Sequence, residues 1–423
     1  MSGARVSGAD AGAADAGGAD AGGARLRLAR QARGFSQQQL AGMAGVSRQA
    51  VSALESGQSD PSLRVALALA GALGMTVEEL FGAEDVVPAV TARLVAGPGQ
   101  RRPGDRDHGG GPGGRGGQEP SSGPRVTLAP VGDAFAAYPL SGPNASRAGF
   151  LPAGGIVVGE PGGAPAAPAP AGRGGDRRVE VRPIGPPRPT LVAAGCDPAL
   201  PLLAPPLGLL DPPVAFAWWP CSSQEALRLA GAGLVHVAGV HLSDRPGGHD
   251  VPATAGLIPG GAEVIGFSAW REGLVLRPES ARRVGGLADI ARAGLRLVNR
   301  EPGAEARRLL DRELAELGID PGRIPGYRTM VTGHLQVADA VAAGLADAGV
   351  ASEPAALAYG LAFAPLATER FDLVIPVALA ERREVQALLR VLSSRWLRDQ
   401  LASLPGYDPS PCGGHVASLG KPG

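Results

Sequence analysis

The stretch SQQQLAGMAGVSRQAVSALESG, residues 36–57, predicts the fold of the N-terminal part of this chain. Ser36 is followed three residues later by a glutamine, which is the pattern of a capping box at the start of a helix. Gly45 ends that helix, Ser47 caps the next one, and Gly57 ends it in turn. A helix, a short glycine-containing turn and a second helix together indicate a helix-turn-helix.

Further helices flank this pair, so we expect residues 24–82 to form one all-α domain. Residues 25–33 place apolar side chains at helical spacing and carry four arginines. The Asp-Pro-Ser sequence at 60–62 opens a fourth helix, and residues 75–81 supply a fifth. Six arginines against four acidic residues give the domain a net charge of +2, which is a modest footprint for a polyanionic partner.

The turn, cap and apolar positions of residues 24–82 resemble the Cro/repressor-type (XRE-type) helix-turn-helix family closely. The resemblance implies that the helix at 47–56 enters the major groove of double-stranded DNA. Because a net charge of +2 is modest, we expect a homodimer to supply the rest of the affinity. A structural or protein-binding helical module is the alternative. The implied DNA-binding residues are Gln37, beside a phosphate, and Ser47, Arg48, Gln49 and Ser52 on the groove-facing helix.

Composition limits what the rest of the chain can be. Of 423 residues, 65 are glycine and 40 proline, and these gather in low-complexity stretches. Forty cations balance forty acidic residues, which excludes a strongly basic nucleic-acid coat protein. We expect residues 1–23, built from Ala, Gly and Asp, to be a disordered tail rather than a signal peptide. Residues 83–123 are expected to be a flexible Gly/Pro-rich linker.

Hydropathy and cysteine content bear on the compartment. The longest apolar region, residues 191–219, is interrupted by aspartates and prolines and is too broken to span a bilayer. Three cysteines do not make a disulfide framework. We therefore expect a soluble, cytoplasmic protein without a membrane partner.

A β-rich segment is expected after the linker. Residues 125–128, 155–158 and 178–182 read as short strands separated by turn residues, and an Ala-Pro run interrupts them at 161–171. Residues 124–187 are thus predicted to be a small β-rich connector with a disordered insertion.

From residue 188 to 423, apolar strands alternate with helices. This alternation predicts a mostly parallel α/β architecture, in which ligands lie at the carboxyl ends of strands and at helix N-termini. The expected strands include 190–194, 213–219, 234–239 and 295–299, and the expected helices include 224–230 and 304–317.

These segments resemble the periplasmic-binding-protein-like domain of the type II fold, which is related to molybdate-binding proteins and occurs fused to DNA-binding modules. The resemblance implies two α/β lobes that close over a small ligand, and hence a ligand-responsive transcriptional regulator. A cytoplasmic binding or storage protein linked to molybdenum metabolism is the alternative. The matching stretches are 194–200, 235–242, 270–274, 298–311 and 333–349.

One departure from the family concerns the ligand. Where such domains have a Gly-Ser-Gly-Thr-Arg-like turn, residues 303–307 read Gly-Ala-Glu-Ala-Arg, so two hydroxyls are missing and a carboxylate is added. The family favours an oxyanion such as molybdate, whereas this change favours an uncharged or cationic ligand.

Strand ends and helix starts supply the candidate ligand residues. Each also has a structural explanation, as a helix cap, an ion pair or a small buried thiol. The candidates are Cys196, Ser222, Ser223, Asn299, Arg300, Arg307 and Thr332, the last taken as the cap of the helix that carries His334.

Catalytic and metal motifs are not evident in the sequence. His236 and His241 are five residues apart on a strand, and Cys412 and His415 lie in a Gly/Pro-rich tail, so neither pair has the spacing of a metal site. The sequence contains neither a nucleophile elbow nor a Walker loop. We therefore expect no metal, no cofactor and no enzymatic activity.

Overall fold

The computed structural model describes residues 16–81, 87–95, 123–141, 148–160, 177–241 and 256–420. The chain divides into two compact units, one ending at Val87 and the other beginning at Pro88. Among the described residues, no helix has both the length and the hydropathy needed to cross a membrane.

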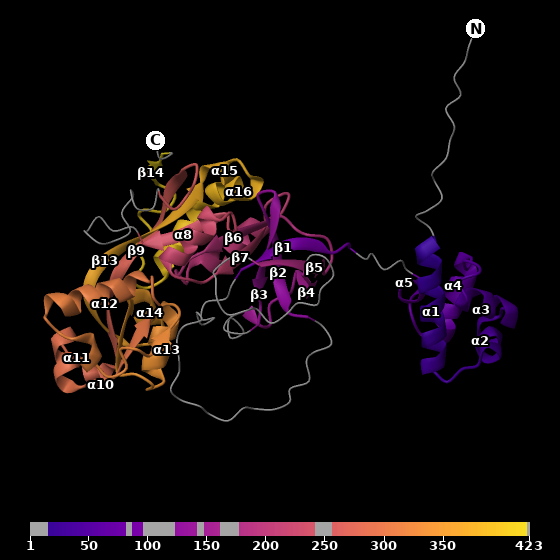
Figure 1. Cartoon of the computed structure of the whole chain (residues 1–423), viewed down its shortest axis with the longest axis horizontal. Helices are drawn as coiled ribbons and strands as arrows, with labels where there is room; N and C mark the ends of the chain where they lie inside the picture. Colours follow the sequence, from indigo (N-terminus) through magenta and orange to yellow (C-terminus); the bar gives the residue numbers. More distant parts are fainter. Residues whose placement is uncertain are drawn as a thin grey trace, which may run out of the picture. The chain divides into compact units, whose positions relative to one another are not determined.

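The first unit is helical (Figure 1). Its turns have the chemistry expected from the sequence: the Ser36 hydroxyl accepts from the Gln39 N–H, and the Gln39 side chain accepts from the Ser36 N–H. Ser47 caps the next helix by accepting from the Ala50 N–H. The predicted helix-turn-helix is confirmed. The helices are α1 (Ala16–Ala32), α2 (Gln37–Ala44), α3 (Arg48–Glu55), α4 (Leu63–Leu73) and α5 (Val77–Phe81).

One apolar core holds these helices together. Each helix contributes a fully buried aliphatic side chain, and full burial of such a side chain is worth about 1.5–3 kcal/mol. Leu26, Leu40, Val51, Leu69 and Leu80 all belong to this core.

Helix α1 begins earlier than expected. Residues 1–23 were predicted to be a disordered tail, but the helix already starts at Ala16. Residues 16–23 hold four glycines and three alanines, so intrinsic helix propensity does not account for this extension. Residues 1–15 lie outside the described part of the chain.

The second unit opens with a small closed barrel. Its strands follow the order β1-β3-β2-β4-β5 around the barrel, and apolar side chains such as Val126 and Val181 fill the interior. The strands are β1 (Val90–Leu94), β2 (Arg125–Val131), β3 (Ala134–Pro139), β4 (Gly155–Gly159) and β5 (Arg177–Pro183).

Strand β1 corrects the expected linker. It lies within residues 83–123, yet it pairs in parallel with β3 and antiparallel with β5, which closes the barrel. Its inward Ala92 is 1% exposed, so the strand is part of the core. The sequence prediction also missed β3. Residues 83–86 and 96–122 of the expected linker, and the Ala-Pro run at 161–171, lie outside the described residues.

The remainder of the second unit is a two-lobed α/β domain built on one sheet of order β11-β10-β12-β9-β13-β8-β6-β7, with β14 paired to β9. The strands are β6 (Thr190–Ala194), β7 (Ala215–Trp219), β8 (Val237–His241), β9 (Ala262–Leu276), β10 (Leu297–Arg300), β11 (Met330–Val331), β12 (Ala348–Ser352), β13 (Ala362–Pro376) and β14 (His415–Leu419). The helices are α7 (Ala204–Gly208), α8 (Ser223–Gly231), α10 (Pro278–Ala281), α11 (Leu287–Ala293), α12 (Glu305–Glu316), α13 (His334–Ala342), α14 (Glu353–Ala358), α15 (Val377–Ala380), α16 (Arg383–Leu392) and α17 (Arg395–Ser403), with short 3-10 helices at Leu200–Leu203 and Pro321–Arg323.

Two long strands, β9 and β13, run through both lobes and pair with each other along their length (Figure 1). We call lobe 1 the part that contains β6, β7, β8 and β14, and lobe 2 the part that contains β10, β11 and β12. Strand β9 pairs with β14 in lobe 1 through residues 262–265 and with β12 in lobe 2 through residues 272–276. The middle of these two strands is therefore the hinge between the lobes.

The sheet is mixed rather than mostly parallel. Strand β6 is parallel to β7 and β8, and β10 is parallel to β11 and β12, as expected. The hinge strands β9 and β13 are antiparallel to each other and to their neighbours β12 and β8. The correction arises because these two strands carry the chain from lobe 1 to lobe 2 and back.

Candidate DNA interface and candidate ligand site

Helix α3 presents one polar face. Arg48, Gln49 and Ser52 are exposed on it, while Val51 and Leu54 are buried in the core on the other side. Ser47 is occupied as the N-cap of this helix. The three exposed side chains are thus free to reach a partner that docks along α3.

A buried ion pair holds the two helices of the motif against α1. The Glu55 carboxylate accepts from Arg30 Nε at 2.5 Å and Nη2 at 3.0 Å, and from Gln37 Nε2 at 2.9 Å. The Glu55 side chain is only 5% exposed. Burial alone would raise the pKa of Glu55, but the hydrogen bonds from Arg30 and Gln37 outweigh it and lower the pKa. Gln37 therefore has a structural role through its hydrogen bond to Glu55, in addition to any phosphate contact.

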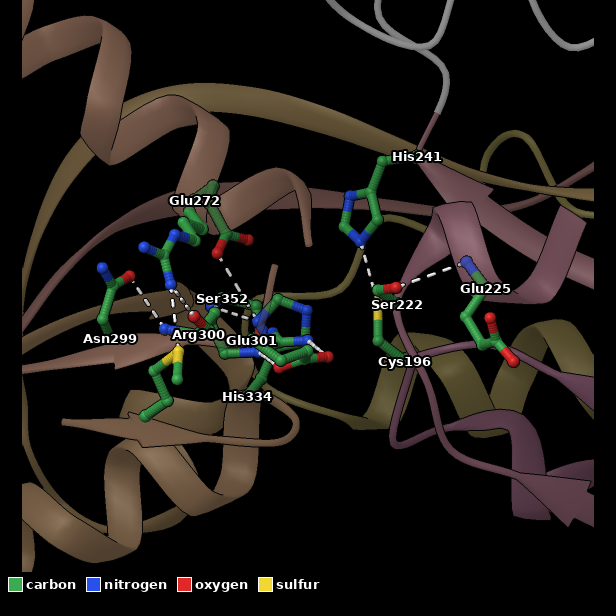
Figure 2. A network of polar contacts seen from close by, with 12 residues as sticks. Cys196, Ser222, Glu225, His241, Glu272, Asn299, Arg300, Glu301, His334 and Ser352 are labelled. Atoms are coloured by element: carbon green, nitrogen blue, oxygen red, sulfur yellow. Dashed lines mark hydrogen bonds and ion pairs between the residues drawn. The ribbon is translucent and has the colours of Figure 1, made fainter. Parts of the chain in front are cut away.

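In the second unit, three ligand-type side chains meet between the lobes (Figure 2). Cys196 follows β6, His241 ends β8, and His334 begins α13. The Cys196 Sγ lies 3.1 Å from His241 Nε2, and one ligand atom from each of the three residues lies within 4.8 Å of the other two. All three residues are buried. Cys196 and His241 belong to lobe 1, and His334 belongs to lobe 2.

Each histidine of this Cys-His-His cluster has a carboxylate beside it. His241 Nδ1 is 3.5 Å from Glu369 Oε2, and His334 Nδ1 is 3.5 Å from Glu272 Oε1. Glu272 lies on β9 and Glu369 on β13, so both carboxylates come from the hinge strands. The backbone N–H of Ser352 also donates to His334 Nδ1, at 3.2 Å.

The charges of these groups depend on one another. Burial opposes ionisation of Cys196, but His241 and His334 outweigh it and lower the thiol pKa to about 5. Burial would lower the pKa of His241, but Cys196 and Glu369 raise it well above the ordinary value. The pKa of His334 is raised in the same way by Glu272. The cluster therefore favours the thiolate form of Cys196 beside His241.

The turn that carries Cys196 is fixed by its neighbour Asp197. The Asp197 carboxylate accepts from the Ala199 N–H, from the Ser268 hydroxyl on β9 and from the Tyr407 hydroxyl. Burial raises the pKa of Asp197 to about 6. These three bonds hold the thiol at the hinge.

The predicted ligand residues Asn299 and Arg300 lie beside the cluster in lobe 2. The Asn299 amide donates to the Tyr327 carbonyl, and its oxygen accepts from the Arg300 N–H. Arg300 is 1% exposed and pairs with Glu301 at 2.8 and 3.0 Å. Its remaining Nη1 has no hydrogen-bond partner within the described residues. Asn299 therefore orders the backbone, whereas Arg300 keeps one buried donor unsatisfied.

The two predicted serines have structural roles. Ser222 is the N-cap of α8 and accepts from the Glu225 N–H at 3.3 Å. The Ser223 hydroxyl accepts from the His241 N–H at 3.2 Å, so it positions a member of the Cys-His-His cluster. Both serines are buried.

Arg307 and Thr332 differ from their predicted roles. Arg307 donates to the Arg300 carbonyl and lies over the Tyr327 ring, so it braces α12 against β10. The N-cap of α13 is Gly333 rather than Thr332, which corrects the expected cap. Glycine at φ +98° adopts a backbone conformation that threonine would adopt only with strain.

A small cavity of about 110 Å³ opens at the cluster and is lined by Cys196, His334 and apolar neighbours such as Trp218 and Leu335. A larger cavity of about 810 Å³ lies between the barrel and lobe 1 and is lined mainly by apolar side chains. The buried titratable groups gather at the small cavity. We therefore take the small cavity as the candidate ligand site.

The lobes approach each other closely at one edge of this site. Gly303 of lobe 2 has φ +86°, and a Cβ placed there would lie 2.7 Å from Gln224 Oε1 and 3.2 Å from Ser222 Oγ, both in lobe 1. A larger residue at this position would strain the backbone and require the Gln224 side chain and Ser222 to shift.

The sequence prediction included Cys196 but missed its partners. In the sequence His241 pairs by spacing with His236, but the His236 ring accepts the Val192 N–H inside the core. The other pair that was considered is also separate, since Cys412 donates to the Leu392 carbonyl and His415 contacts Glu263. The sequence feature that could have identified these residues is their position, because the members of the cluster lie at the ends of strands or at the start of a helix. The missed residues are His241, His334, Glu272 and Glu369.

Comparison with known proteins agrees with this architecture. A helix-turn-helix family model matches residues 26–80, and a PBP superfamily domain model matches residues 207–393. The uncharacterized protein YvgK of Bacillus subtilis (strain 168) is 32% identical over 178 residues, 42% of this chain. The chain spans 57% of the length of YvgK.

Two further proteins resemble the first unit. An uncharacterized HTH-type transcriptional regulator of Methanocaldococcus jannaschii is 39% identical over 61 residues, which is 14% of this chain and 92% of that protein. The solved restriction-modification controller protein C.AhdI from Aeromonas hydrophila is 44% identical over 15% of this chain and 94% of its own, with a TM-score of 0.14. The chain therefore belongs to the helix-turn-helix transcriptional regulators of the XRE type, and in it the DNA-binding domain is fused to a PBP superfamily domain.

Proposed function

We propose that a ligand bound between the two lobes controls how tightly the helix-turn-helix unit binds DNA. The observation that carries this proposal is the Cys-His-His cluster, whose members come from both lobes and whose carboxylate neighbours come from the hinge strands. A ligand that contacts both lobes binds their closed arrangement better than an open one. Such differential affinity is what shifts a conformational equilibrium and couples two sites.

On the DNA side, we propose that Arg48, Gln49 and Ser52 contact bases in the major groove. Their exposure on α3 supports this, since arginine and glutamine side chains read guanine and adenine edges. The domain's net charge of +2 supports binding as a dimer, because each half-site then contributes phosphate contacts. We propose a cytoplasmic location, because a DNA-binding regulator has to reach its operator.

The charges around the site weigh against an oxyanion such as molybdate. Glu272, Glu301, Glu305 and Glu369 lie at or beside the cluster, and their ion-pair partners are Arg300, Arg308 and the two histidines. Burial, and next the nearby charge of Glu369, raise the pKa of Glu305, and a buried carboxylate at this position disfavours an anionic ligand. The cavity volume of about 110 Å³ is well below the 300–1,000 Å³ of most metabolite sites, which supports a very small ligand. We propose that this site binds a ligand and does not catalyse a reaction.

The test uses the full chain. An operator is first selected from random duplexes, and the dissociation constant is then measured by fluorescence anisotropy with and without molybdate, sulfate and Zn²⁺. We expect a sequence-specific site whose affinity changes at least fivefold with one of these ligands, which corresponds to about 1 kcal/mol of coupling. A ligand that binds tightly without altering DNA affinity would refute the proposal and favour the storage alternative. A chain without sequence preference would also refute it.

A further inference from the structure

We propose that the ligand of this site is a borderline or soft transition-metal ion of the Zn²⁺ class, bound by the Cys196 thiolate and the His241 and His334 imidazoles. The proposal deepens the function proposed above and rests on it only for the effect on DNA. The binding itself rests on the donor atoms, their spacing and their surroundings.

The donor set matches this class of ion. Thiolate and imidazole are preferred by Zn²⁺, Cu⁺ and similar ions, whereas Mg²⁺ and Ca²⁺ require oxygen ligands. Bond lengths of about 2.3 Å to sulfur and 2.0–2.1 Å to nitrogen place tetrahedral donors roughly 3.3–3.7 Å apart. The Cys196 Sγ to His241 Nε2 distance is 3.1 Å, and the whole set lies within 4.8 Å. Shifts of about 1 Å therefore suffice to complete the coordination.

The carboxylates are placed as the outer partners of a metal site usually are. A metal-ligating histidine almost always gives its other ring N–H to a carboxylate, a carbonyl or water, which fixes the tautomer. Glu369 Oε2 lies 3.5 Å from His241 Nδ1, the ring nitrogen on the far side from Cys196. Coordination by His334 Nε2 requires a proton on Nδ1, and Glu272 Oε1 at 3.5 Å becomes its acceptor in place of the present Ser352 N–H contact. His334 Nε2 has no hydrogen-bond partner within the described residues.

The cavity and the charge also fit a cation. Three protein ligands leave one coordination position, as in zinc sites that hold water or an exogenous ligand. The cavity of about 110 Å³ borders Cys196 and His334 and offers that position. Cys196 and His241 are in lobe 1 and His334 is in lobe 2, so the ion would join the lobes at the hinge.

The experiment measures metal binding by the full chain after removal of any polyhistidine tag. Zn²⁺ is titrated against a chromophoric chelator, bound zinc is counted by mass spectrometry, and Co²⁺ is used as a spectroscopic probe. We expect one high-affinity ion per chain and a thiolate-to-Co²⁺ charge-transfer band. Cys196→Ser should abolish the band and weaken Zn²⁺ binding by more than about 100-fold, and His334→Gln should weaken it comparably. Glu272→Gln should cost about 10–100-fold.

Matched controls come from the same domain. Cys412 is a buried cysteine outside the cluster, and His415 is an exposed histidine, so Cys412→Ser and His415→Gln should bind Zn²⁺ like the wild type. Circular dichroism establishes that each variant folds. Should Cys196→Ser fail to fold, the Co²⁺ spectrum of the wild type and the His334→Gln titration decide.

Two outcomes separate the metal site from the regulatory function. Sub-stoichiometric Zn²⁺ binding by the wild type, or binding that survives both Cys196→Ser and His334→Gln, would overturn the metal site even where another ligand alters DNA affinity. Stoichiometric binding that Cys196→Ser abolishes, without any change in DNA affinity, would support the metal site and overturn the proposed function.

Discussion

Replacing Glu55 with alanine should destabilise the DNA-binding unit strongly. The change leaves the Arg30 guanidinium, 11% exposed, without its carboxylate and leaves the Gln37 amide without an acceptor. Removing one partner of a buried ion pair costs about 3–5 kcal/mol, and the residual exposure brings our expectation to about 3 kcal/mol. A domain of this size has roughly 3–9 kcal/mol of total stability. At about 4–8 °C per kcal/mol, the melting temperature of the unit should fall by roughly 10–25 °C.

The distribution of tryptophan makes the assay selective. All four tryptophans, Trp218, Trp219, Trp270 and Trp396, lie in the second unit, so their fluorescence reports its unfolding alone. Circular dichroism reports both units. We expect the helical transition to move down in Glu55→Ala while the fluorescence transition stays in place. The control Glu78→Ala removes an exposed glutamate of the same unit and should shift the transition by only a few degrees. A shift in Glu55→Ala no larger than in the control would refute this reasoning.

The same ion pair predicts a pH dependence. The pKa of Glu55 in the folded protein lies below its usual value, so the pair's contribution is present above the unfolded-state pKa of about 4.3. It is lost as the pH falls through the lower folded-state pKa. The melting temperature of the unit should therefore drop on acidification below about pH 4 in the wild type. In Glu55→Gln the melting temperature should drop less on acidification, because the contribution of Glu55 is absent. An equal drop in both proteins would contradict the proposed role of Glu55.

Three further predictions concern the two sites. Gln49→Ala should cost about 1–3 kcal/mol on the selected operator and little on random DNA, and equal losses on both would show that Gln49 does not read bases. Gly303→Ala should weaken Zn²⁺ binding by about tenfold more than Gly318→Ala, because both glycines have positive φ but only Gly303 faces the opposite lobe. Ser222→Ala should lower the stability of the second unit by about 1 kcal/mol through loss of the α8 cap, with little effect on Zn²⁺ binding. Fluorescence anisotropy on DNA measures the first effect, the chelator titration measures Zn²⁺ binding, and fluorescence melting measures stability.

The local chemistry of helix ends explains why the first unit was predictable from sequence. The capping box at Ser36, the cap at Ser47 and the left-handed Gly45 act within a few residues, and the structure contains each of them. The buried pair of Arg30 and Glu55 was not predicted, although both residues lie in the predicted helices. Their side chains are 25 residues apart in the sequence, and only the packing of α1 against α3 brings them together.

Within the α/β domain, the sequence predicts the short strands and helices, because their apolar patterns extend over only a few residues. The long strands β9 and β13 were not predicted as strands, because residues such as Arg271, Glu272 and Glu369 interrupt their apolar pattern. Polar residues in a strand normally indicate a solvated face, and here Glu272 and Glu369 are buried at the hinge. The prediction of a mostly parallel sheet was wrong for the same reason.

The Cys-His-His cluster could not be read from spacing because its members are far apart in sequence. Metal motifs that are recognisable in sequence place their ligands within one turn or loop, whereas Cys196, His241 and His334 come from three separate strand or helix ends. Their meeting depends on the parallel pairing of β6 with β8 and on the hinge strands that bring lobe 2 against lobe 1. The same hinge strands supply Glu272 and Glu369, which are the costly residues to bury. Burying two carboxylates beside the cluster is costly unless a partner neutralises them, and the proposed cation between the lobes would supply that neutralisation.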